Sequence, residues 1–349
     1  MDIGLSLYLG SGLEKNLELI KKAKNASMRY AFTSLHIPEE SRYSNDATEL
    51  IKVCKREKIK LLVDVSPHAL EKYKLGSYEQ LMELGIEYLR PDFGFRIEEI
   101  IRLSKSFHIV FNASTVRKSD IDEMQRKGVD FSRFLGCHNF YPKPLTGISI
   151  LKVRSVNEYL HSLGIKTLAF VPGDKTLRGP IFEGLPTVES HRGADVFAGL
   201  LELEDKTSAD AVLIGDIDVT DETWNKITEY GRGVITLNAT INEEYSYLKD
   251  MVLHERVDNS EHVIRCVESR QFNKKVKAET PRSRPMGTIF ISNEDFLRYE
   301  GEVEIARVDL PPDSRVCVIG YVDDSDIKYI QYVKSGGAFM LSYTRESQD

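Results

Sequence analysis

The chain has 349 residues and a formal net charge of −7, with acidic and basic residues interspersed along its length. This balance argues against nucleic acid as a partner, because a phosphate backbone binds to a basic face. No run of about 18 apolar residues is present, and the N-terminus lacks a basic stretch followed by an apolar one. We therefore expect neither a membrane span nor a signal peptide, and we predict a cytoplasmic protein.

Between residues 1 and 216, short apolar runs typical of strands alternate eight times with segments of helical period. The expected strands are Ile3–Leu9, Tyr30–Leu35, Ile59–Val65, Tyr88–Pro91, His108–Asn112, Phe134–His138, Lys166–Val171 and Ala211–Gly215. The expected helices include Leu13–Ala26, Ala47–Glu57, Ile97–Lys105, Asp120–Lys127, Val153–Leu163 and Ala194–Glu204, with Ser119 as the N-cap before Asp120.

Strands that alternate with helices indicate βαβ units and parallel pairing. Eight such units within about 215 residues fit a closed (β/α)₈ TIM barrel, which belongs to the α/β class. An open doubly wound sheet is the alternative. It would bind a dinucleotide at a glycine-rich first turn, but Leu9-Gly10-Ser11-Gly12 is only a fragment of that fingerprint.

After Asp216 the pattern changes to short strands separated by turn signals. A linking helix is expected at Asp218–Tyr230, and one more helix at Asp326–Val333. The expected strands are Gly233–Leu237, His254–Val257, Val263–Cys266, Thr288–Ile291, Glu300–Arg307, Arg315–Tyr321 and Ala338–Tyr343. We therefore predict two domains, a barrel over residues 1–230 and a small β-rich domain over residues 231–349.

Polar side chains follow the expected barrel strands, where the active sites of such barrels lie. They include Tyr8, His36, Asp64, Arg90, Asp92, Asn112, Asn139 and Tyr141. A single polar residue at such a place is often a helix cap or a loop hydrogen bond. The convergence of many of them at one edge of the barrel is what indicates a site.

The expected loop from Pro172 to Gly193 is long, and it is the most densely charged of these segments. It carries Asp174, Lys175, Arg178, Glu183, Glu189, His191 and Arg192 among its glycines and prolines. Long loops in compact domains are usually functional or disordered, and barrel phosphate sites often use the loops after strands seven and eight. Arg178 and Arg192 suit a bidentate phosphate contact, or they pair with the nearby glutamates and hold the loop.

Acid-base chemistry needs two carboxylates in different environments, and the candidates are Asp64, Asp92, Asp174, Glu183, Glu189 and Asp216. We expect no metal and no other cofactor, because His36, His138 and His191 show no metal-binding spacing. The four cysteines form no C-x-x-C pair and are expected to be small buried side chains. No G-x-S-x-G motif supports a serine nucleophile.

Several segments of the chain are distinctive. They are GLSLYLG, TSLHIPEE, RPDFG, HNFYPKPLTGIS and FVPGDKTLRGPIFEGLPTVESHR in the barrel, and RSRPMGTIFISNEDFLRYEGEVEIARVDLPPDSRVCVIGYV beyond it. From end to end the sequence resembles the bacterial 6-phospho-N-acetylmuramidase family, some members of which carry the label outer surface protein. The resemblance implies that the second domain is a small cyclophilin-like β-barrel.

The resemblance also implies an intracellular glycoside hydrolase without a cofactor. Its substrate would be a phosphorylated amino-sugar disaccharide, N-acetylmuramic acid 6-phosphate joined β-1,4 to N-acetylglucosamine, which arises in peptidoglycan (cell-wall) recycling. On this basis, two of Asp64, Asp92, Asp174, Glu183 and Glu189 flank the scissile bond, and a substrate-assisted mechanism is a further option. Glu183 or Glu189 is the expected general acid and Asp174 its partner. Binding groups would be Tyr8, His36, Arg90, Asn112, Asn139 and Tyr141 for the sugars, with Arg178, Arg192, Arg282 and Arg284 for the phosphate.

Two other functional classes stay open at this point. A sugar-phosphate lyase or isomerase would use a lysine, and Lys143 and Lys175 are the lysines near the expected mouth. A non-catalytic carbohydrate-binding or surface protein would fit the outer-surface label but conflicts with the N-terminus. The sequence also leaves a homodimer open.

Overall fold

The computed structural model describes residues 1–34, 44–66, 76–91 and 94–342. It divides into two units, Met1–Gly231 and Arg232–Asp349, and each is considered by itself below. His36 and Asp92, two of the expected site residues, lie outside the described residues.

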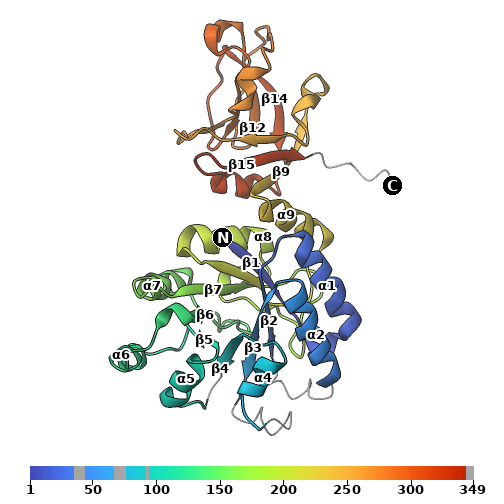
Figure 1. The fold of residues 1–349 in the computed structure, drawn as a ribbon. Helices are drawn as coiled ribbons and strands as arrows, with labels where there is room; N and C mark the ends of the chain where they lie inside the picture. Colours follow the sequence, from blue (N-terminus) through green and yellow to red (C-terminus); the bar gives the residue numbers. More distant parts are fainter. Residues whose placement is uncertain (35–43, 67–75, 92–93, 343–349) are drawn as a thin grey trace. The chain divides into compact units, whose positions relative to one another are not determined.

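The first unit is a closed barrel of eight strands in sequential order, all parallel (Figure 1). Its strands are β1 Asp2–Ser6, β2 Tyr30–Ser34, β3 Lys60–Val65, β4 Tyr88–Pro91, β5 His108–Asn112, β6 Phe134–Cys137, β7 Lys166–Val171 and β8 Ala211–Ile214. The barrel closes where β1 pairs with β8, in a register that sets Asp2 against Ala211. The (β/α)₈ prediction is therefore confirmed, and the alternative of an open doubly wound sheet is wrong.

Helices surround the strands of this unit (Figure 1). They are α1 Leu13–Asn25, α2 Ser44–Arg56, α4 Glu79–Glu83, α5 Ile97–Ser104, α6 Lys118–Arg126, α7 Ile150–His161, α8 Val196–Thr207 and α9 Asp221–Gly231. Each of the longer helices turns an apolar stripe inward; α1, for example, buries Leu19, Ile20 and Ala23. The N-cap expected at Ser119 is wrong, because α6 begins at Lys118, two residues earlier than expected, with Arg117 as its cap.

Alternating strand residues fill the barrel interior. The buried cluster comprises Tyr30, Phe32, Leu62, Tyr88, Val110, Leu135, Cys137, Leu168, Phe170, Ala211 and Leu213. The rings of Phe32 and Phe170 meet edge to face, and the partly buried Phe140 packs against both. Because side chains alternate along a strand, the residue two positions beyond each core residue also faces the barrel axis. The inward-facing residues next to the core, toward the carboxyl ends of the strands, therefore form the next layer of the barrel interior.

The second unit is mostly β, as predicted. Its seven-stranded sheet has the order β10-β15-β9-β14-β12-β13-β11, in which β15 and β9 are parallel and the other pairs antiparallel. The strands are β9 Val234–Ile241, β10 Val252–His254, β11 Val263–Arg265, β12 Thr288–Ser292, β13 Val303–Ala306, β14 Val316–Val322 and β15 Ala338–Ser342. The helix expected at Asp326–Val333 is a 3₁₀ helix, Ile327–Tyr332.

Candidate active site

Three neighbouring barrel strands carry a row of polar side chains at their carboxyl ends. Ser34, Asp64 and Arg90 are direct partners in the registers of β2, β3 and β4, and each lies two residues beyond a core residue. Arg90 Nη1 donates a hydrogen bond to Asp64 Oδ1 at 2.8 Å, and Ser34 Oγ donates to Oδ2 at 3.3 Å. Asp64 and Arg90 are both buried. Arg90 thus gives this buried carboxylate a charged partner.

Asn139 extends this polar row from the end of β6. Its Oδ1 accepts a hydrogen bond from Arg90 Nη2 at 2.6 Å, and its backbone N–H donates to Ser114 Oγ at 3.1 Å. Asn112, at the end of β5, uses its own Oδ1 to accept the backbone N–H of Ser114 at 3.0 Å. The structure therefore brings together four of the residues expected from sequence: Asp64 and Arg90 directly, Asn139 through Arg90, and Asn112 through Ser114.

The long loop after β7 is fixed at its base by one carboxylate, Asp216. This side chain is fully buried and accepts three backbone N–H groups, from Gly173 at 2.8 Å, Arg178 at 2.8 Å and Leu185 at 2.9 Å. Burial raises the pKa of Asp216, although these hydrogen bonds and the charge of Arg178 act in the opposite direction. The sequence pointed to Asp216 as a candidate acid-base group, and the geometry gives it the position of a loop anchor.

Arg178 lies over the aromatic ring of Tyr8. Its guanidinium carbon is 4.4 Å from the ring centroid, a cation–π distance. Tyr8 is buried, and its hydroxyl donates to the carbonyl of Gly215. Among the described residues, none forms a hydrogen bond or an ion pair with the Arg178 guanidinium. No described residue occupies its five N–H donors, which suit an anionic ligand.

Glu189 and Arg192 form a clamp between two loops. Arg192 binds both carboxylate oxygens of Glu189, at 2.7 and 2.9 Å. The same oxygens accept the backbone N–H groups of Leu145 at 2.8 Å and Gly147 at 2.7 Å, in the loop after β6. Gly147 permits this approach, since a Cβ there would lie 2.5 Å from Glu189 Oε2. The hydrogen bonds from Arg192, first among several causes, lower the pKa of Glu189 to about 2.

The guanidinium of Arg192 also donates hydrogen bonds to backbone carbonyls. It donates to those of Glu183, Gly184, Tyr141 and Lys143. Of the two readings that the sequence left open for Arg192, the geometry matches the one in which the arginine holds the loop. Glu189 is ionised at neutral pH, whereas a general acid must carry a proton there. These contacts do not support Glu189 as the general acid or Arg192 as a phosphate ligand.

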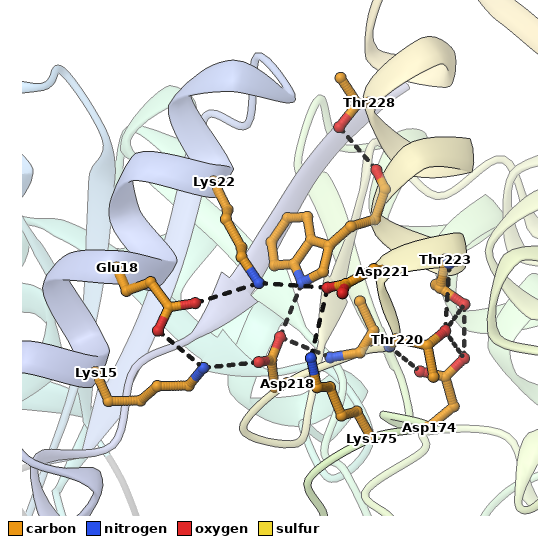
Figure 2. Close-up of polar contacts among 12 residues, drawn as sticks. Lys15, Glu18, Lys22, Asp174, Lys175, Asp218, Thr220, Asp221, Thr223 and Thr228 are labelled. Atoms are coloured by element: carbon orange, nitrogen blue, oxygen red, sulfur yellow. Dashed lines mark hydrogen bonds and ion pairs between the residues drawn. The ribbon is translucent and has the colours of Figure 1, made fainter.

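Asp174 lies beside the start of α9 (Figure 2). Its Oδ1 accepts the backbone N–H of Thr220 at 2.6 Å, and its Oδ2 accepts the hydroxyl of Thr223 at 2.6 Å. Lys175, the next residue, contacts Asp221 at 3.4 Å in the first turn of α9. This pair fastens the loop after β7 to α9, and the contacts do not support Asp174 as the partner of the general acid.

The same corner of the barrel contains an ion pair between buried Asp218 and the half-buried Lys15, which the sequence did not indicate. Asp218 accepts hydrogen bonds from Lys15 Nζ and from the Trp224 indole N–H, both at 2.8 Å (Figure 2). Burial opposes ionisation of Asp218, but the hydrogen bonds from Lys15 and Trp224 lower its pKa below the ordinary value. The pair links α1 to the segment between β8 and α9, and nothing in the spacing of residues 15 and 218 could have indicated it.

The remaining expected residues have fewer contacts or lie elsewhere. Glu183 is exposed, and its carboxylate forms no hydrogen bond or ion pair with the described residues. The side chain of Tyr141 is half-buried. Arg284, in the second unit, is buried over the ring of Phe290 and donates to the carbonyl of Pro311 at 2.8 Å. Arg282, also in that unit, is exposed.

The two described histidines of the expected trio have separate partners. His138 is fully buried, with Nε2 at 2.8 Å from Asn157 Oδ1 and Nδ1 at 3.2 Å from Ser114 Oγ. Burial lowers the pKa of His138 to about 4. His191 Nε2 lies 2.8 Å from Glu202 Oε2. Within the described part of the chain, no group of three or more His, Cys, Asp and Glu side chains is arranged to hold a metal ion.

A pocket of about 650 Å³ opens beside Asn112 and Asn139, between α5 and α6. Its apolar wall includes Phe95, Phe111, Ile97, Ile100, Met124 and Phe134, and Arg117 and Asp120 add charged groups. Sequence analysis missed this pocket, because its wall comes from helix faces and strand residues that only the folded barrel brings together. The polar row, Arg178 and this pocket all lie at the carboxyl ends of the strands. No helix in the described part of the chain is both long and apolar enough to cross a membrane.

Comparison with known proteins identifies the family. The family model described as 6-phospho-N-acetylmuramidase, N-terminal, matches residues 3–229, and the corresponding C-terminal model matches residues 234–342. A conserved protein of unknown function from Enterococcus faecalis is 34% identical, with a TM-score of 0.85 over 99% of this chain and 97% of its own. An uncharacterized B. cereus protein is 24% identical, with a TM-score of 0.76 over 99% of both chains. No curated protein matches the chain. The two family models cover nearly the whole sequence, and the chain therefore belongs to the 6-phospho-N-acetylmuramidase family.

Proposed function

We propose that this protein is a glycosidase that hydrolyses the β-1,4 bond between N-acetylmuramic acid 6-phosphate and N-acetylglucosamine. Family membership supports the reaction class. The observation that carries the substrate is Arg178, whose guanidinium stacks on buried Tyr8 and forms no hydrogen bond or ion pair with the described residues. An arginine fork of this kind suits a phosphate, and Arg192 serves a different purpose because it holds the loops.

For the chemistry, we assign Asp64 and Glu183. Asp64 is the carboxylate of the polar row, fixed by Arg90 at 2.8 Å, and it would orient the acetamido group or stabilise positive charge at the sugar ring. Glu183 is the carboxylate of the loop after β7 that has no other described task. As the general acid, it would donate a proton to the oxygen of the leaving sugar. Asn139, held by Arg90, and Asn112 and Tyr141 would contact hydroxyl or acetamido groups.

The reaction is tested by incubating the purified protein with phosphorylated and unphosphorylated muramyl disaccharides and following the products by mass. Cleavage of the phosphorylated form alone is expected, and no cleavage of it would contradict the proposal. For the assigned roles, Asp64→Asn and Glu183→Gln are each expected to lower kcat by at least about a hundredfold. Near-wild-type turnover by either folded variant would remove that residue from the mechanism.

The finer parts of this function are also proposals. We infer a cytoplasmic enzyme of cell-wall recycling. Fractionation of the cells checks this, and recovery outside the membrane would favour the surface-protein alternative. The lyase or isomerase alternative would need a Schiff base at Lys143 or Lys175, which borohydride trapping detects. The cyclophilin-like character of the second unit and a homodimer stay predictions.

A further inference from the structure

We infer that Phe182 is a stacking platform for the leaving-group sugar, a specificity-determining role that rests on the function proposed above. Phe182 lies at the tip of the loop after β7, four residues beyond Arg178. Phe182 is 62% exposed, although phenylalanine side chains are ordinarily buried in the core. An exposed aromatic ring at a barrel mouth presents a flat apolar face, which matches the C–H face of a pyranose.

The tip that carries Phe182 is firmly held. Asp216 accepts the backbone N–H groups of Arg178 and Leu185, one on each side of the tip. The N–H of Phe182 donates to the carbonyl of Arg178 at 3.3 Å, which closes the turn. Arg192 adds hydrogen bonds to the carbonyls of Glu183 and Gly184. A ring on such a base loses little conformational freedom when a ligand binds.

The backbone at Phe182 is in the left-handed region, with φ of 59°. This conformation is unfavourable for a bulky side chain, and such residues concentrate at functional sites. The edge of the ring lies against Gly179, where an added Cβ would be 2.9 Å from ring Cζ and 3.3 Å from Cε2. A side chain at position 179 would displace the ring of Phe182, so glycine at this position allows the ring its present place.

The exposure of Tyr8, Arg178 and Phe182 indicates which of the two sugars would stack on Phe182. Tyr8 is 2% exposed, Arg178 over its ring is half-buried, and Phe182 is 62% exposed, so exposure to solvent increases in this order. A phosphorylated sugar that places its phosphate on Arg178 occupies the inner position. The sugar joined to it then extends outward, toward the level of Phe182. The platform thus belongs to the unphosphorylated N-acetylamino sugar that leaves.

The test compares two substrates that share the phosphorylated sugar, namely the phosphorylated disaccharide and the methyl β-glycoside of N-acetylmuramic acid 6-phosphate. Phe182→Ala is expected to lower kcat/KM for the disaccharide about tenfold, mostly through KM, and for the methyl glycoside less than about threefold. Phe182→Trp should restore the disaccharide value. Gly179→Ala, which displaces the ring without removing it, should give a smaller loss than Phe182→Ala with the same selectivity.

Leu84→Ala is the matched control, because Leu84 is also an exposed apolar residue but precedes β4, at the opposite edge of the barrel. It should change neither value. Equal losses on both substrates, or no loss in Phe182→Ala, would overturn the platform. If the wild type cleaves neither substrate, the proposed function fails, and saturation-transfer NMR with N,N′-diacetylchitobiose then decides about Phe182. A signal that drops in Phe182→Ala keeps the platform, whereas an absent or unchanged signal rejects it.

Discussion

At the scale of single residues, Glu189 makes the stability of the loops depend on pH. Hydrogen bonds from Arg192 lower its pKa from 4.5 to about 2 in the folded state, so the folded protein favours the ionised form. The resulting stabilisation is present above the unfolded pKa and is lost as pH falls through the folded value. We predict that Glu189→Gln lowers the free energy of unfolding at pH 7 by about 1–3 kcal/mol, and that the difference from wild type shrinks below pH 4.5.

Urea denaturation at pH 7 and at a series of lower values measures this difference. Glu158→Gln is the control, because Glu158 forms an exposed pair with Arg154 one turn away on α7, and such pairs contribute about 0.3–0.5 kcal/mol. A difference between Glu189→Gln and wild type that stays constant down to the acid limit would show that the ionised carboxylate is not what holds the two loops.

The sequence predicted where the polar residues of the site lie but not which of them are partners. Asp64, Arg90 and Asn139 could be found because they follow apolar strands, and strand ends converge in a barrel. That Arg90 binds both of the others depends on the register of strands from different parts of the chain. The contacts of Glu189 could not be deduced for the same reason, since they involve backbone groups 42 and 44 residues earlier.

At the scale of elements, Asp174 connects the loop after β7 to the start of α9. Its carboxylate accepts the N–H of Thr220, the residue before the helix, and the hydroxyl of Thr223 in the first turn. We predict that Asp174→Ala lowers the free energy of unfolding by about 1 kcal/mol, as the loss of a cap does. Turnover of the phosphorylated disaccharide should stay within about threefold of wild type, because these contacts leave the carboxylate no catalytic task.

Urea denaturation and a steady-state assay of the same preparation test both parts of this expectation. Asp122→Ala on α6 is the control for removing an exposed carboxylate, and it should change neither quantity. A loss of kcat of a hundredfold or more in folded Asp174→Ala would return Asp174 to the catalytic pair.

The elements themselves were largely predictable because their patterns are local. Seven of the barrel strands were expected to within about two residues at each end, since each is an apolar run between polar turns. The helix α4, Glu79–Glu83, was missed because five residues make little more than one turn and show no period. The start of α6 was misplaced because Arg117, which is not a usual capping residue, precedes it.

At the scale of the whole molecule, closure of the barrel brings Arg178, Tyr8 and the polar row to one edge. The count of strands predicted closure, but the pairing of β1 with β8 joins residues more than 200 positions apart and could not be deduced locally. The consequence for function is that one ligand would contact several strands at once. Such a ligand binds only the folded barrel and must therefore stabilise it.

We predict that N-acetylmuramic acid 6-phosphate, at a hundred times its Kd, adds about 2.7 kcal/mol to the stability of the barrel. This corresponds to a rise in Tm of about 5–10 °C for a unit of this size. Thermal unfolding of Arg178→Ala should show little of the rise, because the guanidinium that binds the phosphate is gone. Arg154→Ala, which removes an exposed arginine from α7, should keep it in full. An equal rise with unphosphorylated N-acetylmuramic acid, or an undiminished rise in Arg178→Ala, would mean that the phosphate is bound elsewhere or not at all.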